Sequence, residues 1–95
     1  MPTEQKANRI RTVKEVVDLY LKAYELTHRT KSVLFAKGRL AHINRWLGNV
    51  VLPDLTEARI RDYIRQRQLE KASGRTINME LGELSRAIGQ HWSLL

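Results

Sequence analysis

The sequence contains no cysteine, only two prolines and five glycines, and no long apolar run in its 95 residues. Without cysteine, the chain can form neither a disulfide framework nor a cysteine-based metal site. Its histidines, His28, His42 and His91, lack the spacing of metal ligands. Because no stretch of ~18 apolar residues occurs, we expect no transmembrane helix, and the polar N-terminus does not look like a secretory signal. These absences favour a cytoplasmic domain that uses no metal or other cofactor.

Positive charge is what the sequence has in excess. Seventeen Lys and Arg residues against ten Asp and Glu residues give a formal net charge of +7, which in so small a domain favours an anionic partner such as nucleic acid. The excess is concentrated in residues 28–45, and no carboxylate lies between Glu25 and Asp54. Elsewhere the basic residues have acidic neighbours along the chain. The sequence therefore predicts a contact surface in segment 28–45, with cations that no acid neutralises.

Hydrophobic residues recur at helical spacing in four segments, and no segment shows the alternation of a strand. Thr12 stands three residues before Glu15, which is the spacing of a capping box and predicts the start of the first helix. This helix continues to about residue 26. The second helix opens at Thr30 or Ser32 and ends before Gly48, since glycine is common just after a helix.

Two further helices are expected in the second half of the chain. Thr56 is the predicted N-cap of the third, and Leu55 and Ile60 have the spacing of a hydrophobic staple. A polar break precedes the fourth helix, which begins between Ser73 and Thr76. Four amphipathic helices on short connections predict a compact all-α four-helix bundle. The residues expected in its core are Val13, Val16, Val17, Tyr20, Ala23, Tyr24, Val33, Ala36, Leu40, Ile43, Leu47, Ile60, Tyr63, Ile64, Leu69, Ile77, Leu81, Leu84, Ile88 and Trp92.

The order and spacing of these features resemble those of a known family. The residues that carry the resemblance are, in chain order, Thr12-x-x-Glu15, Thr30-Lys31-Ser32, Leu47-Gly48-x-x-x-Leu52, Leu55-Thr56, Ile60-x-x-Tyr63-Ile64 and Ser73-x-x-Thr76-Ile77-Asn78-x-x-Leu81-x-x-Leu84. Across residues 12–95 the chain is similar to the N-terminal core-binding (SAM-like) domain of phage integrases and other tyrosine recombinases. One departure is His91 followed by Trp92, where the family commonly has a small residue near the end of the last helix.

The resemblance implies a DNA-binding domain that is not an enzyme by itself. In this family the domain lies on one face of the recombination-site DNA, and a C-terminal domain with all the catalytic residues closes around the other face. We expect residues 1–11 to form a flexible basic arm and residues 12–95 to form the core-binding domain, which stops about where the linker to the catalytic domain would begin. The expected partners are double-stranded DNA and the catalytic domain of the same parent chain. The parent protein, bacterial or phage-encoded, is expected to be tetrameric on DNA, and the isolated domain monomeric.

The second helix carries the first set of expected DNA contacts. Its face opposite the core stripe is basic, and Gly38 removes side-chain bulk where a phosphate backbone would approach. The alternative is an ordinary solvated surface. Phe35 on this face is expected to pack on the first helix, although contact with the catalytic domain or with a thymine methyl group also fits. The DNA-binding residues expected on this helix and at its start are Arg29, Thr30, Lys31, Lys37, Arg39, His42 and Arg45.

The start of the fourth helix carries the second set. Hydroxyl, guanidinium and amide donors lie there beside the positive end of the helix dipole, which favours phosphate. The alternative for Ser73 is that it only caps the helix. The residues of this set are Ser73, Arg75, Thr76 and Asn78. A row of small side chains at positions 78, 82, 85 and 89 indicates close packing against another helix or close approach of DNA.

The third helix is expected to stay outside the DNA site. Its basic residues alternate with Glu57, Asp62 and Glu70, so they should form a solvated, salt-bridged surface. These basic residues are Arg59, Arg61, Arg65 and Arg67.

Two other classes of function stay open. A helix-turn-helix transcriptional regulator fits the helices and the charge, although the sequence shows no helix pair with the usual tight, glycine-containing turn. A protein-interaction bundle fits the helices but leaves the acid-free stretch unexplained. An enzyme is disfavoured because no nucleophile–base pair or metal cluster is visible.

Overall fold

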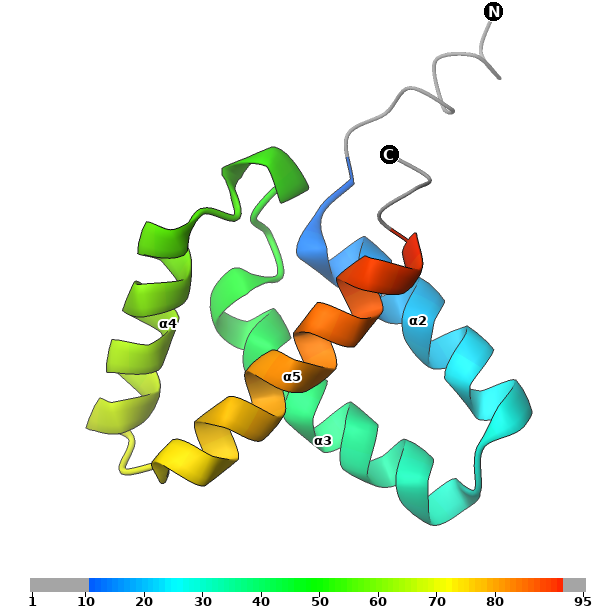
Figure 1. The fold of residues 1–95 in the computed structure, drawn as a ribbon. Helices are drawn as coiled ribbons and strands as arrows, with labels where there is room; N and C mark the ends of the chain where they lie inside the picture. The colour runs from blue at the N-terminus through cyan, green and yellow to red at the C-terminus, as the bar shows by residue number, and fades with distance from the viewer. Residues whose placement is uncertain (1–10, 92–95) are drawn as a thin grey trace, which may run out of the picture.

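The computed structural model describes residues 11–91, with side chains placed for residues 11–89. This part contains the helices α2 (Val13–Thr27), α3 (Thr30–Leu47), α4 (Glu57–Leu69) and α5 (Gly74–His91), shown in Figure 1, and a short 3₁₀ helix, η1 (Leu52–Asp54). Within it there is no β-strand, and no helix is long and apolar enough to cross a membrane. The predicted all-α four-helix bundle is therefore confirmed. Residues 1–10 of the expected basic arm lie outside the described part.

The start of α2 is held by a capping box and by the loop that follows α3. The Thr12 hydroxyl accepts a hydrogen bond from the Glu15 N–H at 3.3 Å, and the Glu15 carboxylate accepts one from the Thr12 N–H at 3.2 Å, which confirms the predicted box. The Val13 N–H donates to the Val50 carbonyl at 2.9 Å. The loop thereby satisfies a donor that the first turn of a helix leaves free.

Gly48 ends α3 as expected, but not because of a left-handed conformation. Its φ of −56° and ψ of −37° are those of a right-handed helix. A Cβ atom at this position would lie 2.4 Å from the carbonyl oxygen of Asn44. Glycine is needed here because the surrounding backbone leaves no room for a side chain.

A tight turn over residues 70–73 joins α4 to α5, with no glycine among these four residues. Lys71 has a φ of 67°, in the left-handed region that glycine usually occupies. The Lys71 N–H donates to the Gln68 carbonyl at 2.9 Å, and the Ala72 N–H donates to the Arg67 carbonyl at 3.0 Å. This pair of bonds is a Schellman motif, which ends α4 sharply.

Helix α5 crosses α2 and α3 and packs mainly against them, while α4 lies to one side (Figure 1). Most of the expected core positions are at least half-buried, and Tyr20 is fully buried. Three expectations are wrong, because Ala23 is exposed, Leu69 is 71% exposed, and Phe35 is 56% exposed rather than packed on α2. No other element of the described residues 11–91 covers these positions. Trp92 lies outside the described residues.

Candidate nucleic-acid interface

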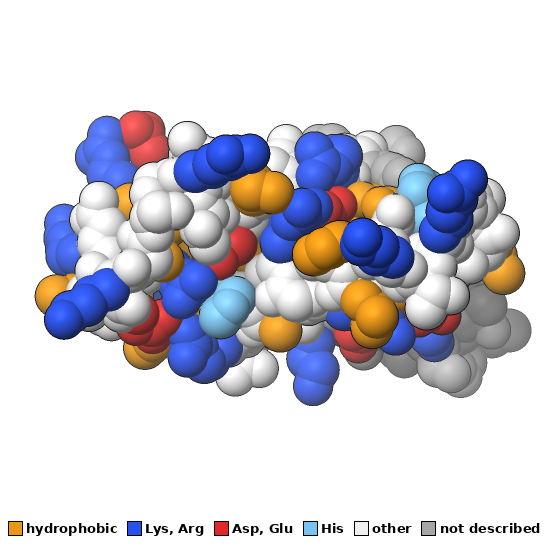
Figure 2. All heavy atoms as spheres, turned by 90° about the horizontal axis from the view of Figure 1, so that it is seen from below, with side chains coloured by type: hydrophobic (Ala, Val, Ile, Leu, Met, Phe, Trp, Pro, Cys, Tyr) orange, Lys and Arg blue, Asp and Glu red, His pale blue; other side chains and the backbone are white. Residues whose placement is uncertain are grey.

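Helices α3 and α5 form two adjoining hollows on the lower face of the molecule, which Figure 2 views from below. They share Arg39 and Met79, and we refer to them together as the α3/α5 groove. The larger hollow, of about 590 Å³, is lined by Arg39, Arg75, Asn78, Met79, Gly82 and Arg86. The smaller hollow, of about 370 Å³, is lined by Leu34, Phe35, Gly38, Arg39, His42, Thr76, Met79 and Glu80.

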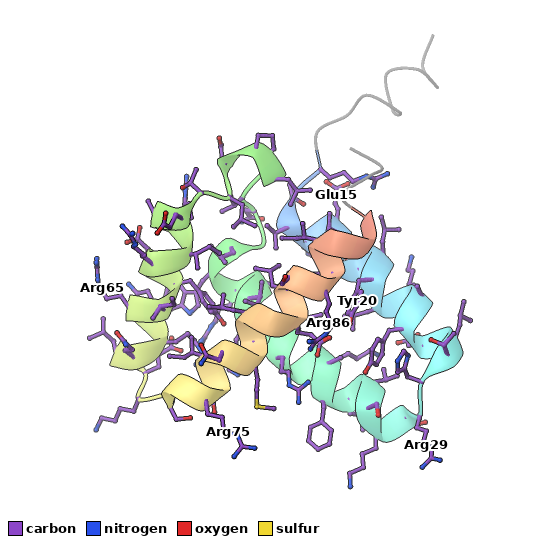
Figure 3. All side chains as sticks on the ribbon, in the orientation of Figure 1. Glu15, Tyr20, Arg29, Arg65, Arg75 and Arg86 are labelled. Atoms are coloured by element: carbon purple, nitrogen blue, oxygen red, sulfur yellow. The ribbon has the colours of Figure 1, made fainter. Side chains whose placement is uncertain are left out.

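The groove brings together residues from both predicted DNA-contact sets. Those that line it are Arg39 and His42 from α3, and Arg75, Thr76 and Asn78 from α5. Arg29, Thr30 and Lys31 are exposed where α3 begins. Figure 3 shows Arg29 and Arg75 near the same lower edge of the molecule, both directed away from the core. Lys37 and Arg45 are exposed on α3 but are not among the residues that line the groove.

The expectation that the cations of segment 28–45 have no acidic partner is wrong for three of them. Carboxylates from other helices lie within ion-pair distance of their side chains. The pairs are Lys37 with Glu25 at 2.8 Å, Arg39 with Glu83 at 3.0 Å and Arg45 with Glu70 at 2.6 Å. The sequence hides these pairs because their members are far apart along the chain. Arg29 and Lys31 have no ion pair among the described residues.

Arg67 corrects a second expectation, since it is buried rather than solvated. Its Nε and Nη2 atoms donate to the two carboxylate oxygens of Glu80 at 2.9 and 2.7 Å. Its Nη1 atom donates to Glu70 at 2.7 Å, and Glu70 also accepts from Arg45. The Tyr63 hydroxyl donates to Glu80 at 2.5 Å. We call these residues, namely Arg45, Tyr63, Arg67, Glu70 and Glu80, the Glu80 cluster.

The charges of the Glu80 cluster stabilise one another. Burial by itself would raise the pKa of Glu80, but hydrogen bonds from Arg67 and Tyr63 outweigh it, and the pKa lies below its ordinary value. The hydrogen bond to Glu80 raises the pKa of Arg67. Burial and the bond to Glu80 raise the pKa of the Tyr63 hydroxyl. The cluster therefore holds an ionised pair inside the protein.

A similar cluster lies one turn further along α5, around Glu83. The Tyr20 hydroxyl donates to its carboxylate at 2.6 Å and Arg39 at 3.0 Å, and Arg86 lies 3.1 Å from it. We call these four residues the Glu83 cluster, and Figure 3 shows two of them, Tyr20 and Arg86, close together. Glu83 is buried, whereas the side chains of Arg39 and Arg86 are 28% and 58% exposed. Both arginines line the α3/α5 groove, so this cluster links the core to the surface.

Opposing effects also set the pKa values of the Glu83 cluster. Burial would raise the pKa of Glu83, but hydrogen bonds from the tyrosine and the two arginines bring it below its ordinary value. Burial and the bond to Glu83 raise the pKa of Tyr20 to about 12. Glu83 therefore stays ionised and holds two guanidinium groups at the groove.

The start of α5 is capped as the alternative for Ser73 proposed. The Ser73 hydroxyl accepts a hydrogen bond from the Thr76 N–H at 3.1 Å, so Ser73 is a helix cap. Arg75 and Asn78 are exposed beside it. Both line the larger hollow.

The row of small residues on α5 does not pack against another helix. A Cβ atom at Gly89 would meet nothing within 4 Å, and one at Gly82 would meet only the end of Arg86 at 3.7 Å. Gly38 on α3 is equally open. These positions leave space at the surface, so the packing interpretation is wrong.

Sequence reasoning missed Met79, Glu80, Glu83 and Arg86. For the two acids, the position on the helix could have predicted that they are buried. Glu80 lies three residues from Ile77, and Glu83 lies four residues from Ala87, so both share the helix face of the core. A carboxylate in such a position requires a buried cationic or hydroxyl partner.

The chain matches no protein-family model, and no curated protein or solved structure is significantly similar to it. The described residues also contain no cluster of three or more side chains that could hold a metal ion.

Proposed function

We propose that this protein binds double-stranded DNA through the α3/α5 groove, chiefly by contacts with the phosphate backbone. The observation that carries the proposal is the composition of the larger hollow. Three arginines and an asparagine line it, and no acidic side chain is among its lining residues. A guanidinium group suits phosphate because its planar array of donors can bind two oxygens at once.

The arginines of the groove differ in how they are held. Glu83 orients Arg39 and Arg86 and neutralises one of their two charges. Arg75 has no ion pair in the described part of the chain and contributes a full charge. With three arginines in its lining and Glu83 paired to two of them, the larger hollow keeps an excess of positive charge. Lys31 and Arg29 extend this basic surface along the start of α3.

The sequence resemblance supports a specific setting for this activity, namely the core-binding domain of a tyrosine recombinase or phage integrase. In that setting the domain grips recombination-site DNA during site-specific recombination or integration. It acts with a catalytic domain of the same parent chain, in a tetramer on DNA, and has no catalytic activity or cofactor of its own. The ordered motifs over residues 12–95 and the all-α bundle both fit this setting.

A helix-turn-helix regulator is the second candidate, because α4 and α5 are joined by a tight turn after all. In such proteins the second helix of the pair enters the major groove through its N-terminal residues. Here that helix would be α5, so both candidates use the same surface. DNase footprinting separates them, since a recombinase domain protects the arms of a recombination site and a regulator protects an operator beside a promoter.

Replacing Arg75 with alanine tests the DNA-binding proposal. The affinity for a fluorescent 20-base-pair duplex is measured by anisotropy over a series of salt concentrations. We expect steep salt dependence for the unaltered protein, and a slope of log affinity against log salt that is lower by about 0.9 for the variant, because one phosphate contact is lost.

Arg61→Ala is the matched control, since Arg61 is an exposed cation on α4, 2.6 Å from Glu57 and not among the groove residues. It changes the net charge by the same amount. Equal loss of affinity in both variants would show that overall charge, not the groove, drives binding. Absence of duplex binding by the unaltered protein at low salt would exclude the proposed function.

A further inference from the structure

The α3/α5 groove contains an apolar patch that phosphate contacts do not explain. Leu34, Phe35 and Met79 are 63%, 56% and 40% exposed, and all three line the smaller hollow. Figure 2 shows hydrophobic side chains on this face among those of Lys and Arg. Large apolar side chains that gather on a surface commonly mark a contact site, because exposing them to water is unfavourable.

The patch is accessible and lies close to the cations. Gly38 also lines the smaller hollow, and because a Cβ atom there would meet nothing within 4 Å, the space beside Leu34 and Phe35 is open. Met79 enters from α5 and lines both hollows together with Arg39. The one acidic side chain that lines the smaller hollow, Glu80, is buried and bound to Arg67. A partner on this surface therefore needs apolar groups within a few ångströms of negative charge.

The major groove of DNA meets this requirement. Each thymine presents a C5-methyl group there, between two phosphate backbones, and the groove is wide enough to admit a helix. The minor groove shows no methyl group. Charge complementarity between the arginines and the phosphates thus favours duplex DNA over an apolar protein surface as the occupant.

We propose that Phe35 and Met79, supported by Leu34, contact thymine methyl groups in the major groove and give this protein a sequence preference. The inference rests on the proposed function, because it assigns base contacts to the patch and phosphate contacts to the surrounding cations. In this arrangement α3 and α5 together contact the bases that determine the sequence preference.

Replacing thymine with deoxyuridine removes only the methyl group and tests the inference directly. A preferred duplex is first selected from a random 20-base-pair pool with the unaltered protein, and each thymine is then replaced in turn. We expect the affinity to fall about fourfold at each contacted thymine, which is the value of one buried methyl group. Phe35→Ala and Met79→Ala should bind the thymine duplex more weakly and lose this sensitivity.

Leu26→Ala is the control, because Leu26 is 86% exposed but belongs to α2, which lines neither hollow. It should keep the full sensitivity to the methyl group. Circular dichroism checks that each variant is folded, and if an alanine variant unfolds, the methyl series with the unaltered protein still decides the question.

Unchanged affinity at every deoxyuridine substitution would overturn the inference. It would also fail if Phe35→Ala bound the selected duplex as tightly as the unaltered protein, a result that favours a protein partner for the patch. Loss of affinity in Arg75→Ala would meanwhile leave the proposed function standing. If no duplex bound at all, the inference and the proposed function would both be wrong.

Discussion

The Glu80 and Glu83 clusters use the same chemistry one helical turn apart, yet they face different surroundings. Each has a buried carboxylate on α5 that accepts a hydrogen bond from a tyrosine and pairs with arginine. In the Glu80 cluster the main partner, Arg67, is also buried, with 8% of its side chain exposed. In the Glu83 cluster the arginines reach the α3/α5 groove. The central ion pair of the first cluster is buried on both sides, whereas both arginines of the second cluster reach the surface.

This difference suits the Glu80 cluster to a structural role and the Glu83 cluster to a role in the proposed DNA binding. A buried ion pair adds little net stability compared with apolar residues of the same shape, but breaking it leaves an uncompensated charge. Because Tyr63 and Arg67 lie on α4 and Glu80 lies on α5, α4 has to pack on α5 in the arrangement that keeps their hydrogen bonds. The Glu83 cluster joins α2, α3 and α5 and also positions two guanidinium groups where an anion can reach them. Similar residues thus hold the fold in one place and, under the proposed function, present cations to DNA in the other.

The largest contrast is expected between Glu80→Gln and Glu83→Gln. The first variant leaves Arg67 buried without its bidentate partner, so we expect a loss of about 3–5 kcal/mol in the free energy of unfolding. In the second variant both arginines can turn to water, and we expect a smaller loss of about 1–3 kcal/mol. Urea denaturation followed by circular dichroism measures both.

Glu57→Gln serves as the reference for these variants, because it removes an exposed i,i+4 pair with Arg61 and should change stability little. Equal losses for Glu80→Gln and Glu83→Gln would show that exposure of the arginines does not distinguish the clusters.

Acid should destabilise the protein through both clusters. The pKa values of Glu80 and Glu83 are lowered in the folded state from an ordinary value of 4.5. Their stabilising contribution is therefore complete above that value and is lost as the pH falls through the lower folded pKa values. Stability should decrease below about pH 4.5, by ~1.4 kcal/mol per pH unit for each extra proton that the unfolded chain binds.

Unfolding curves at a series of pH values between 3 and 7 test this expectation, on the order of one curve per half pH unit. Glu80→Gln and Glu83→Gln should each show a shallower decline than the unaltered protein, because each removes one titrating group. A decline that stays as steep in both variants would locate the acid sensitivity in other carboxylates, such as Glu70, whose pKa the hydrogen bond from Arg67 also lowers.

The smallest expected effects separate Arg86 from Arg45 in DNA binding. Both are exposed arginines paired with a glutamate, but only Arg86 lines the groove. Arg86→Gln should weaken DNA binding by several-fold and lower the salt slope by about 0.9, whereas Arg45→Gln should leave both nearly unchanged. The anisotropy titration described above measures them, and a larger effect for Arg45 would move the interface toward α4.

The helices and their caps could be predicted from the sequence, whereas the pairing of the charged residues could not. Thr12 and Thr56 cap their helices as predicted, and Ser73 is a cap as its alternative interpretation proposed, because a cap depends on residues within one turn. A break after the third helix was expected, but its tight turn was not, since Lys71 takes a left-handed conformation that is expected of glycine. Phe35 was expected to pack on the first helix, but its apolar character does not say whether another element covers it, and it is exposed.

The sequence by itself determined the four helices, their caps and the identity of most core residues. Hydrophobic periodicity and capping are local, so they can be read along the chain. It also placed Arg39, His42, Arg75, Thr76 and Asn78 among the candidate DNA contacts, and these line one groove. Only the tertiary structure decided which cations are paired, because Glu25, Glu70 and Glu83 reach α3 from other helices. An ion pair depends on distance in space, and the separation of 44 positions between Arg39 and Glu83 conceals it until the helices pack.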